Sequence, residues 1–283
     1  MTTGVNYPWA SGTAYEAYVG RWSRLVAREF LEWLAIPPLR RWLDVGSGTG
    51  ALTEAILVRC DPRSVVGIDA SEGAVDHARE AVKDPRASFA VGLASDTGLA
   101  DDEVDIVVWG LVLNFVPDIG EAIAEGRRVV KPGGVVAGYV WDYAEGMQPI
   151  RRFWDAAVAL DPAAAALDQG ARLPTAAREP LSAAFVAVGL EAVDVRSIEV
   201  PTVFSDFDDF WNPFLGGTGS APGYVASLSE AARDALRDRL RMTMPTEPDG
   251  SIRLTARAWA ARGQRPASIP LESNGGDHEG RRR

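Results

Sequence analysis

The chain has 283 residues, 47% of them apolar, and a formal net charge of −10 at pH 7. This length and apolar content are sufficient for one large α/β domain with insertions. The acidic balance argues against a nucleic-acid partner, because such binding needs a clustered basic surface. One cysteine and two histidines provide no disulfide framework and too few ligands for a thiolate or histidine metal site, so we expect no metal.

The apolar pattern shows no targeting or membrane-spanning segment. The N-terminal stretch has no apolar core behind a basic start, and the longest mainly apolar run, residues 106–116, is too short to cross a bilayer. We therefore expect a cytoplasmic protein without a membrane span.

Apolar periodicity and turn residues predict helices alternating with strands over the first half of the chain. In order, the pattern predicts a helix at 15–36, a strand at 40–45, a helix at 51–59, a strand at 65–69, a helix at 71–82 capped by Ser71, a strand at 87–91, a strand at 104–109, a helix at 118–130 and a strand at 135–141. The Lys-Pro-Gly-Gly of residues 131–134 is a strong helix stop. This alternation predicts a doubly wound, mostly parallel sheet.

The alternation is less regular after residue 141. The expected elements there are helices around 153–167, 181–188 and 229–242 and strands at 193–200 and 252–259, which bring the sheet to seven strands. Residues 203–224 are rich in aromatic side chains. We expect one domain over 1–262, with a cofactor-binding core at 15–142, helical, aromatic-rich cap insertions at 143–180 and 201–249, and a disordered tail at 263–283.

The strand at 40–45 ends in three alternating glycines, Gly46, Gly48 and Gly50. Glycines between a strand and a helix let the backbone approach a ligand, and the N–H groups at the helix start can hold an anionic group. Asp44 lies inside the strand end, where burial of a carboxylate is costly unless a cationic or donor group meets it. The spacing is Gly-x-Gly-x-Gly rather than the Gly-x-Gly-x-x-Gly of dinucleotide folds. A tight turn without a ligand would need the same glycines.

Asp69 closes the strand at 65–69 and follows Gly50 by 19 residues. An acid at this place and spacing accepts hydrogen bonds from ribose hydroxyls, although an ordinary acid also occurs before a helix. Asp69 and the glycine turn together predict a cofactor that contains ribose.

Four ordered runs resemble the motifs of the class I S-adenosylmethionine-dependent methyltransferases, in particular the ubiquinone-biosynthesis-type branch. The runs are LDVGSGTG at 43–50, VGIDAS at 66–71, DIVV at 105–108 with a continuation at 113–116, and RRVVKPGG at 127–134. The resemblance covers about half of the chain, residues 15–142. It implies a Rossmann-like methyltransferase fold, S-adenosyl-L-methionine as cofactor and methyl transfer as the reaction.

The resemblance also assigns the methionine end of the cofactor to the glycine turn. Gly46, Ser47, Gly48 and Gly50 would approach that end, and Asp44 would face its amino group.

The remaining cofactor contacts follow from the same resemblance. Asp69 would hold the ribose hydroxyls, Ala70 would lie against the adenine, and Trp109 would be a further contact. Arg21 belongs to a segment that folds over the cofactor in related enzymes and would pair with the cofactor carboxylate. A surface position on an amphipathic helix is the alternative for Arg21.

Adenine recognition departs from the family pattern. An acid often contacts the adenine amino group in the family, but Leu93 occupies that position here. The contact would then depend on the Ala94 backbone, or on Ser95 or Asp96.

Methyl transfer from a sulfonium is a direct displacement, so alignment supplies much of the rate and a base is needed only for a protonated nucleophile. Asp142 and Tyr143 follow the strand at 135–141 and are the candidates for such a base. Loop solvation for Asp142 and cap packing for Tyr143 are the alternatives. The aromatic stretch suggests a lid over a small, apolar or aromatic acceptor, although such residues also form cores.

We therefore expect a monomeric or homodimeric methyltransferase that acts on oxygen, nitrogen or carbon of a small molecule. Two other functions stay open: a non-catalytic S-adenosylmethionine-binding protein, and a nicotinamide-dependent dehydrogenase, which the glycine spacing disfavours.

Overall fold

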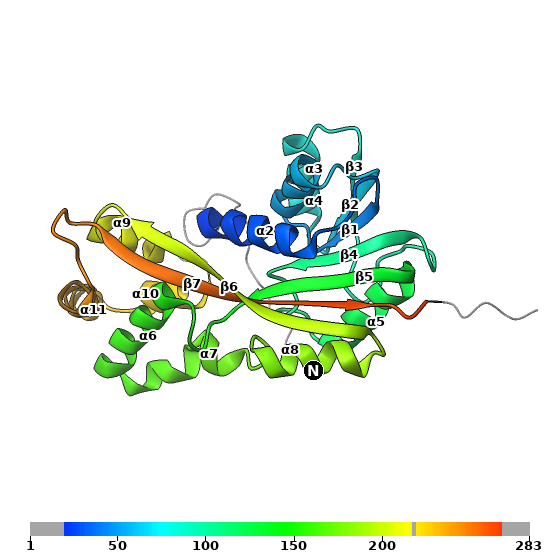
Figure 1. Cartoon of the computed structure of the whole chain (residues 1–283). Coiled ribbons are helices and arrows are strands. Elements are labelled where there is room, and N and C mark those ends of the chain that lie inside the picture. The colour runs from blue at the N-terminus through cyan, green and yellow to red at the C-terminus, as the bar shows by residue number, and fades with distance from the viewer. Residues whose placement is uncertain (1–19, 217–218, 268–283) are drawn as a thin grey trace, which may run out of the picture.

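The computed structural model describes residues 20–216 and 219–267 (Figure 1). Within these residues, one sheet has the strand order β3-β2-β1-β4-β5-β7-β6. The strands are β1 (Arg41–Val45), β2 (Ser64–Asp69), β3 (Ala87–Val91), β4 (Val104–Gly110), β5 (Val130–Trp141), β6 (Glu191–Phe204) and β7 (Ile252–Gln264). β1 to β5 are parallel, and β7 runs antiparallel between β5 and β6. The predicted seven-stranded, mostly parallel sheet is confirmed.

Helices cover both faces of this sheet. The helices of the first half are α2 (Arg21–Leu34), α3 (Ala51–Arg59), α4 (Glu72–Ala81) and α5 (Ile119–Val129). Those of the second half are α6 (Gln148–Leu160), α7 (Gln169–Arg172), α8 (Arg178–Ala187), α9 (Phe207–Trp211), α10 (Ser220–Ser227) and α11 (Glu230–Thr243), with 3-10 turns η2 (Pro162–Leu167) and η3 (Asn212–Gly216). One buried cluster joins α2 and α3 to the sheet, and a second joins α5 and α8 to its other face.

Local sequence signals account for several helix ends. Ser71 caps α4 as predicted, since its hydroxyl accepts a hydrogen bond from the Ala74 N–H. The predicted helix at 15–36 ends early, at Leu34, because Ala35 takes the left-handed conformation (φ 48°) before two prolines. Its predicted start at residues 15–19 lies outside the described residues.

The start of β5 differs from the prediction. The strand begins at Val130 rather than Val135, and its pairing with β4 shifts register across residues 131–134. Gly133 takes a positive φ of 78° in this bulge. The Arg265 guanidinium donates hydrogen bonds to three carbonyl oxygens at the end of α5 and the start of β5. The Lys-Pro-Gly-Gly run therefore stops the helix as expected but forms a bulged strand instead of a loop.

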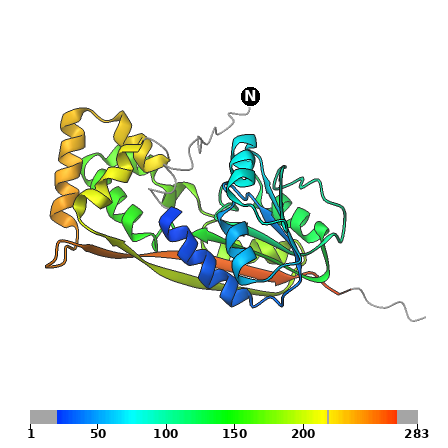
Figure 2. The ribbon, with the colours of Figure 1, turned by 90° about the horizontal axis from the view of Figure 1, so that it is seen from above.

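The β6–β7 pair is longer than predicted and projects beyond the sheet. β5 pairs with β7 only from Val135↔Gln264 to Trp141↔Ala258, whereas β6 and β7 stay paired as far as Phe204↔Ile252. Helices α6, α9, α10 and α11 gather around the far end of this ribbon (Figure 1). Viewed from above, α2 lies between these helices and the β1–β3 half of the sheet (Figure 2). The far end of the β6–β7 ribbon and the four helices around it therefore lie beyond the end of β5.

Candidate functional site

The glycine turn after β1 has the backbone conformation that its sequence demands. Gly46, Gly48 and Gly50 all have positive φ, at 71°, 53° and 91°. A Cβ on Gly46 would lie 2.5 Å from a methyl carbon of Val112. At Gly48, by contrast, no heavy atom of the described residues other than the adjoining ones lies within 4 Å of a Cβ position. The turn is therefore closed beneath Gly46 and open at Gly48, where a ligand can reach the backbone.

Asp69 connects the end of β2 to this turn. Its Oδ2 accepts a hydrogen bond from the Gly48 N–H at 2.9 Å, and its Oδ1 accepts one from the Ser71 N–H at 2.9 Å. Ala70 is exposed beside it. The structure thus brings together the two features that the sequence placed 19 residues apart.

The turn after β3 lies next to the same strand end, because the Gly92 N–H donates to the Asp69 carbonyl oxygen at 3.1 Å. Leu93 and Asp96 exchange two backbone hydrogen bonds that close the turn. Ser95 at its tip is exposed, and Ala94 is half-buried. This places the predicted adenine contacts beside Asp69.

Asp44 is the buried carboxylate of the site, with a side chain 1% exposed. Its Oδ2 accepts a hydrogen bond from the Thr53 hydroxyl at 2.7 Å, while Oδ1 and the neighbouring Ser47 Oγ are buried without a partner. Burial raises the pKa of Asp44 to about 7; the Thr53 hydrogen bond acts against this rise and the charge of Asp69 adds to it. An incoming cationic or N–H donor group would satisfy the free oxygen.

Two residues assigned to the cofactor by resemblance have other surroundings. Arg21 forms an ion pair with Asp209 at 3.0 Å and stacks on the rings of Trp22 and Phe204. The fully buried Trp109 ring lies against Gly126 of α5, within the cluster on that face of the sheet. The prediction for Trp109 is therefore wrong, because its side chain points under α5.

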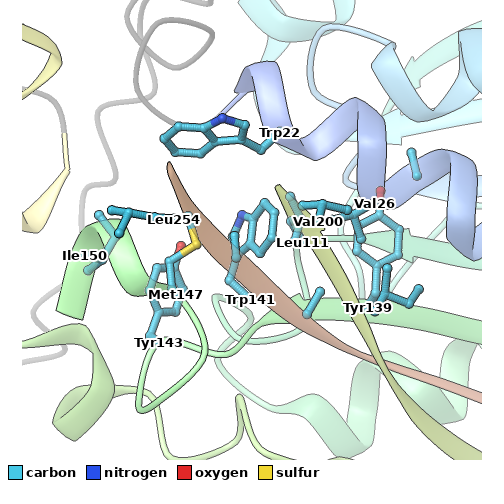
Figure 3. Packing of buried hydrophobic residues seen from close by; sticks show 14 of the residues in the cluster. Trp22, Val26, Leu111, Tyr139, Trp141, Tyr143, Met147, Ile150, Val200 and Leu254 are labelled. Atoms are coloured by element: carbon cyan, nitrogen blue, oxygen red, sulfur yellow. The ribbon is translucent and has the colours of Figure 1, made fainter. Parts of the chain in front are cut away.

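Asp142 and Tyr143, the candidate bases, lie in the loop after β5. Asp142 Oδ2 pairs with the Arg257 Nη2 at 2.6 Å, and its Oδ1 accepts a hydrogen bond from the Glu145 N–H. Both carboxylate oxygens are thus engaged, so Asp142 holds the loop to β7 and presents no free carboxylate. Tyr143 is buried in the aromatic cluster below Met147 (Figure 3).

Three buried polar side chains, two at the carboxyl edge of the sheet and one on the projecting β6–β7 ribbon, were missed by the sequence reasoning. Both amide atoms of Asn114, the Trp141 Nε1 and the Thr202 Oγ1 are buried without a hydrogen-bond partner. Position could have indicated the first two, since Asn114 follows β4 and Trp141 ends β5, at the edge where open α/β sheets bind ligands. No signal marked Thr202, because the strand was predicted to end at Val200.

Neither a metal site nor a membrane helix is found in residues 20–216 and 219–267. No three His, Cys, Asp or Glu side chains gather there as metal ligands. No helix in these ranges combines the length and the apolar character needed to cross a membrane.

A parallel sheet whose first strand ends in a Gly-x-Gly-x-Gly turn, with an acid closing the second strand on that turn, defines a Rossmann-like domain for a ribose-containing cofactor. Residues 43–138 match the protein family described as a methyltransferase domain. This match covers about a third of the chain, and it agrees with the S-adenosylmethionine-dependent methyltransferase class that the motifs predicted.

Two characterised proteins show the extent of the sequence similarity. The chain is 32% identical over 149 residues to trans-aconitate 2-methyltransferase of Variovorax paradoxus, covering 53% of this chain and 56% of that protein. It is 30% identical over 203 residues to 2-methyl-6-phytyl-1,4-hydroquinone methyltransferase of Synechocystis sp., covering 69% of this chain and 62% of that protein. The matches thus span between half and two thirds of these relatives.

Solved structures share the fold. The YcgJ protein of Bacillus subtilis matches with a TM-score of 0.57 at 19% identity, covering 86% of this chain and 100% of that one. Phosphoethanolamine N-methyltransferase 2 of Haemonchus contortus, solved with S-adenosyl-L-methionine, matches with a TM-score of 0.54 at 18% identity, covering 92% of this chain and 56% of that one. At such identities the likeness concerns the fold alone.

The residues of the site fit the cofactor of this class. Asp44 offers a buried, unpartnered oxygen, the Cβ side of Gly48 is open, and Asp69 stands at the end of the neighbouring strand, where it accepts the Gly48 N–H. These are the groups that an ammonium, a carboxylate and a ribose would require.

Proposed function

We propose that the protein transfers a methyl group from S-adenosylmethionine to a small, apolar or aromatic acceptor. The observation that carries the proposal is the buried Asp44 carboxylate, which has one free oxygen beside the open glycine turn. When bound, the cofactor supplies an electrophilic methyl group on a sulfonium.

The contacts of this chain toward the cofactor follow the order of the strands. Asp44 would accept the amino group, and the carboxylate end would lie at the glycine turn, where the N–H groups of Gly46, Ser47 and Gly50 already donate to backbone carbonyls and that of Gly48 donates to Asp69. Asp69 would accept the ribose hydroxyls after release of the Gly48 N–H. Ala70, Ala94 and Ser95 would line the adenine side.

Alignment, rather than a strong base, is the catalytic contribution we propose. Among the described residues, Asp142 is held by Arg257, and Asn114 is a neutral amide. Holding an acceptor in line with the methyl group and the sulfur can lower the barrier substantially without proton transfer.

The nature of the acceptor follows from what lines the carboxyl edge of the sheet. The loop and helices beyond β5 contribute apolar and aromatic side chains, including Met147, Ile150 and Phe153. Of the two relatives named above, the hydroquinone-methylating enzyme acts on a ring that suits such surroundings better than a polycarboxylate does. We propose that residues 143–180 and 201–249 form the cap over this acceptor.

Calorimetry with S-adenosylmethionine and S-adenosylhomocysteine tests the cofactor assignment. Asp69→Ala should abolish binding, whereas Asp76→Ala, which removes an exposed acid on α4, should leave it intact. Tight binding of NADH with no binding of either methionine-derived compound would refute the proposal and favour a dehydrogenase.

A panel of phenols, amines and quinols with a labelled methyl donor tests catalysis. Incorporation of label into one class identifies the acceptor atom. Cofactor binding without any transfer would favour a non-catalytic binding protein. Sedimentation analysis would distinguish between the two predicted states, a monomer and a homodimer.

A further inference from the structure

The turn that follows β3 is open to solvent at its tip and tied to β2 at its base. We name residues 92–98 the β3 turn. The side chain of Leu93 is 56% exposed, and Ser95 is exposed as well. At the base, the Gly92 N–H donates to the Asp69 carbonyl oxygen at 3.1 Å. Because β3 is an edge strand of the described sheet, the position of the turn depends on few other contacts.

The tip of the β3 turn carries backbone groups that are available to a ligand. Leu93 and Asp96 exchange two backbone hydrogen bonds. The N–H and carbonyl groups of Ala94 and Ser95, between them, form no hydrogen bond within the part of the chain that the structure describes. A backbone N–H and a backbone carbonyl on adjacent residues provide one donor and one acceptor. The tip therefore offers both kinds of group close to Asp69.

Thr97 fixes the far end of the β3 turn. It is buried, with 5% of its surface exposed. Its N–H and its hydroxyl both donate to Glu125 Oε1, at 2.9 and 2.7 Å, and its hydroxyl oxygen accepts a hydrogen bond from the Leu99 N–H at 3.3 Å. The hydroxyl thus donates and accepts at once, so this one side chain joins the turn to α5 and to the residues that follow.

Glu125 is the acid on α5 that receives these hydrogen bonds, and it is 9% exposed. Arg128 orients its carboxylate, since Arg128 Nε donates to Oε2 at 2.7 Å and Nη2 donates to Oε1 at 2.8 Å. Arg128 Nη2 also donates to the Leu99 carbonyl oxygen at 2.7 Å. Hydrogen bonds to a charged carboxylate are shorter and stronger than those to a neutral group. The β3 turn therefore takes its position from a fixed acid on a helix that packs in the core.

The two ends of the β3 turn are held by residues with different roles. Asp69 holds the base through its carbonyl oxygen, and its side chain is the acceptor proposed above for the ribose hydroxyls. Glu125 holds the other end through Thr97. Together they set the separation between the ribose contact and the backbone groups at the tip. Hydrogen bonds weaken steeply when distance and angle depart from their optimum, so a shift of the tip would alter what it binds.

We propose that Glu125 is a positioning residue that, through Thr97, sets the discrimination between adenine and other purines at the cofactor site. Adenine presents an amino donor beside a ring-nitrogen acceptor, which a backbone carbonyl and N–H can satisfy. Hypoxanthine presents a carbonyl acceptor and an N–H donor at the same two places. Backbone groups held in position would therefore bind the first base and reject the second. The inference rests on the proposed S-adenosylmethionine function and deepens it.

Calorimetry of the full chain with S-adenosylhomocysteine and S-inosylhomocysteine measures this discrimination as a ratio of two affinities. The two compounds differ only at the base, where an oxygen replaces the amino group. We expect the wild-type protein to bind S-adenosylhomocysteine about 10- to 100-fold more tightly, because the inosine compound leaves two backbone groups unpaired.

Three variants change the anchor of the turn, and a fourth is the control. Glu125→Ala removes the acceptor of both Thr97 hydrogen bonds and should reduce the affinity ratio to about 1- to 3-fold. Thr97→Val removes only the hydroxyl and should lower the ratio about 3- to 10-fold, whereas Thr97→Ser keeps the hydroxyl and should retain the wild-type ratio. Ile123→Val, at a fully buried position of the same helix, should lower the Tm by about 2–4 °C and leave the ratio unchanged.

Binding of both compounds with equal affinity by the wild-type protein would overturn this inference alone. Binding of neither would overturn the proposed cofactor and the inference with it. The positioning role is also overturned if Glu125→Ala and Thr97→Val keep the wild-type ratio, or if Thr97→Ser loses it. Loss of the ratio in Ile123→Val would have the same consequence, since general destabilisation would then be the cause. If Glu125→Ala does not fold, the comparison of Thr97→Val with Thr97→Ser decides.

Discussion

Replacing Asp44 by Asn removes the one buried carboxylate of the glycine-turn site while keeping an oxygen that can accept the Thr53 hydrogen bond. Burial raises the pKa of Asp44 from 3.8 to about 7. The folded protein therefore keeps this proton up to about pH 7, whereas the unfolded chain loses it near pH 4. The stability that the protonated acid contributes is fully present below pH 3.8 and is lost as the pH rises through about 7.

The magnitude follows from the width of that window. One proton held over about 3 pH units, at about 1.4 kcal/mol per unit, corresponds to about 4 kcal/mol of unfolding free energy. Asp44→Asn has no such dependence at this position. Its stability relative to wild type should therefore increase from pH 4 to pH 8, with the variant more stable at the alkaline end by up to about 4 kcal/mol.

Urea unfolding at pH 4, 5, 6, 7 and 8 measures this difference. Asp76→Asn, at an exposed acid on α4, is the control and should differ little from wild type throughout. A constant difference between Asp44→Asn and wild type across this pH range would refute the reasoning. At pH 8 the same variant should bind S-adenosylmethionine more weakly, because the amino group would lose its anionic partner.

Three further changes test other parts of the structure. Gly46→Ala should lower stability by about 1–3 kcal/mol and weaken cofactor binding, because its Cβ would meet Val112; an unchanged Tm would contradict this. Arg257→Gln leaves the buried Asp142 carboxylate without its cation. Because Arg257 is partly exposed, the expected fall in the urea midpoint corresponds to only about 2–3 kcal/mol of unfolding free energy. Burial acts to raise the pKa of Glu125, but hydrogen bonds from its neighbours outweigh it and lower the pKa to about 2. The charged form thus stabilises the fold above pH 4.5, and this stability is lost as the pH falls toward 2. Glu125→Gln should therefore reduce the loss of unfolding free energy between pH 4.5 and pH 2 by about 3 kcal/mol. An unchanged loss over this pH range would count against the assignment.

The core of the cofactor site could be predicted because its signals are local. Positive φ values at Gly46, Gly48 and Gly50 require glycine wherever a strand turns this sharply into a helix. Asp69 ends a strand that pairs in parallel with β1, so the two strand ends had to meet. The pairing of neighbouring parallel strands is enough to bring such residues together. Their proximity can therefore be predicted without information about contacts between residues far apart in the sequence.

Trp109 shows where local signals fail. Strand β4 is buried on both faces, so an almost continuous apolar run carries no alternation that would tell one face from the other. The side chain belongs to the α5 face, and the prediction that it contacts the cofactor was wrong for that reason. Arg21 is a different case, because its partner Asp209 lies 188 residues away in sequence.

The sequence by itself determined the parallel sheet, the glycine turn with Asp44 and Asp69, and hence the class of cofactor, because strand periodicity, glycine conformation and motif spacing act over short distances along the chain. The tertiary structure decided how the second half of the chain is arranged. The β6–β7 ribbon projects past β5 only because its two strands pair with each other over a greater length than with the sheet. That projection buries Thr202 opposite Leu254, beyond the end of β5, where no local pattern indicated a buried polar side chain.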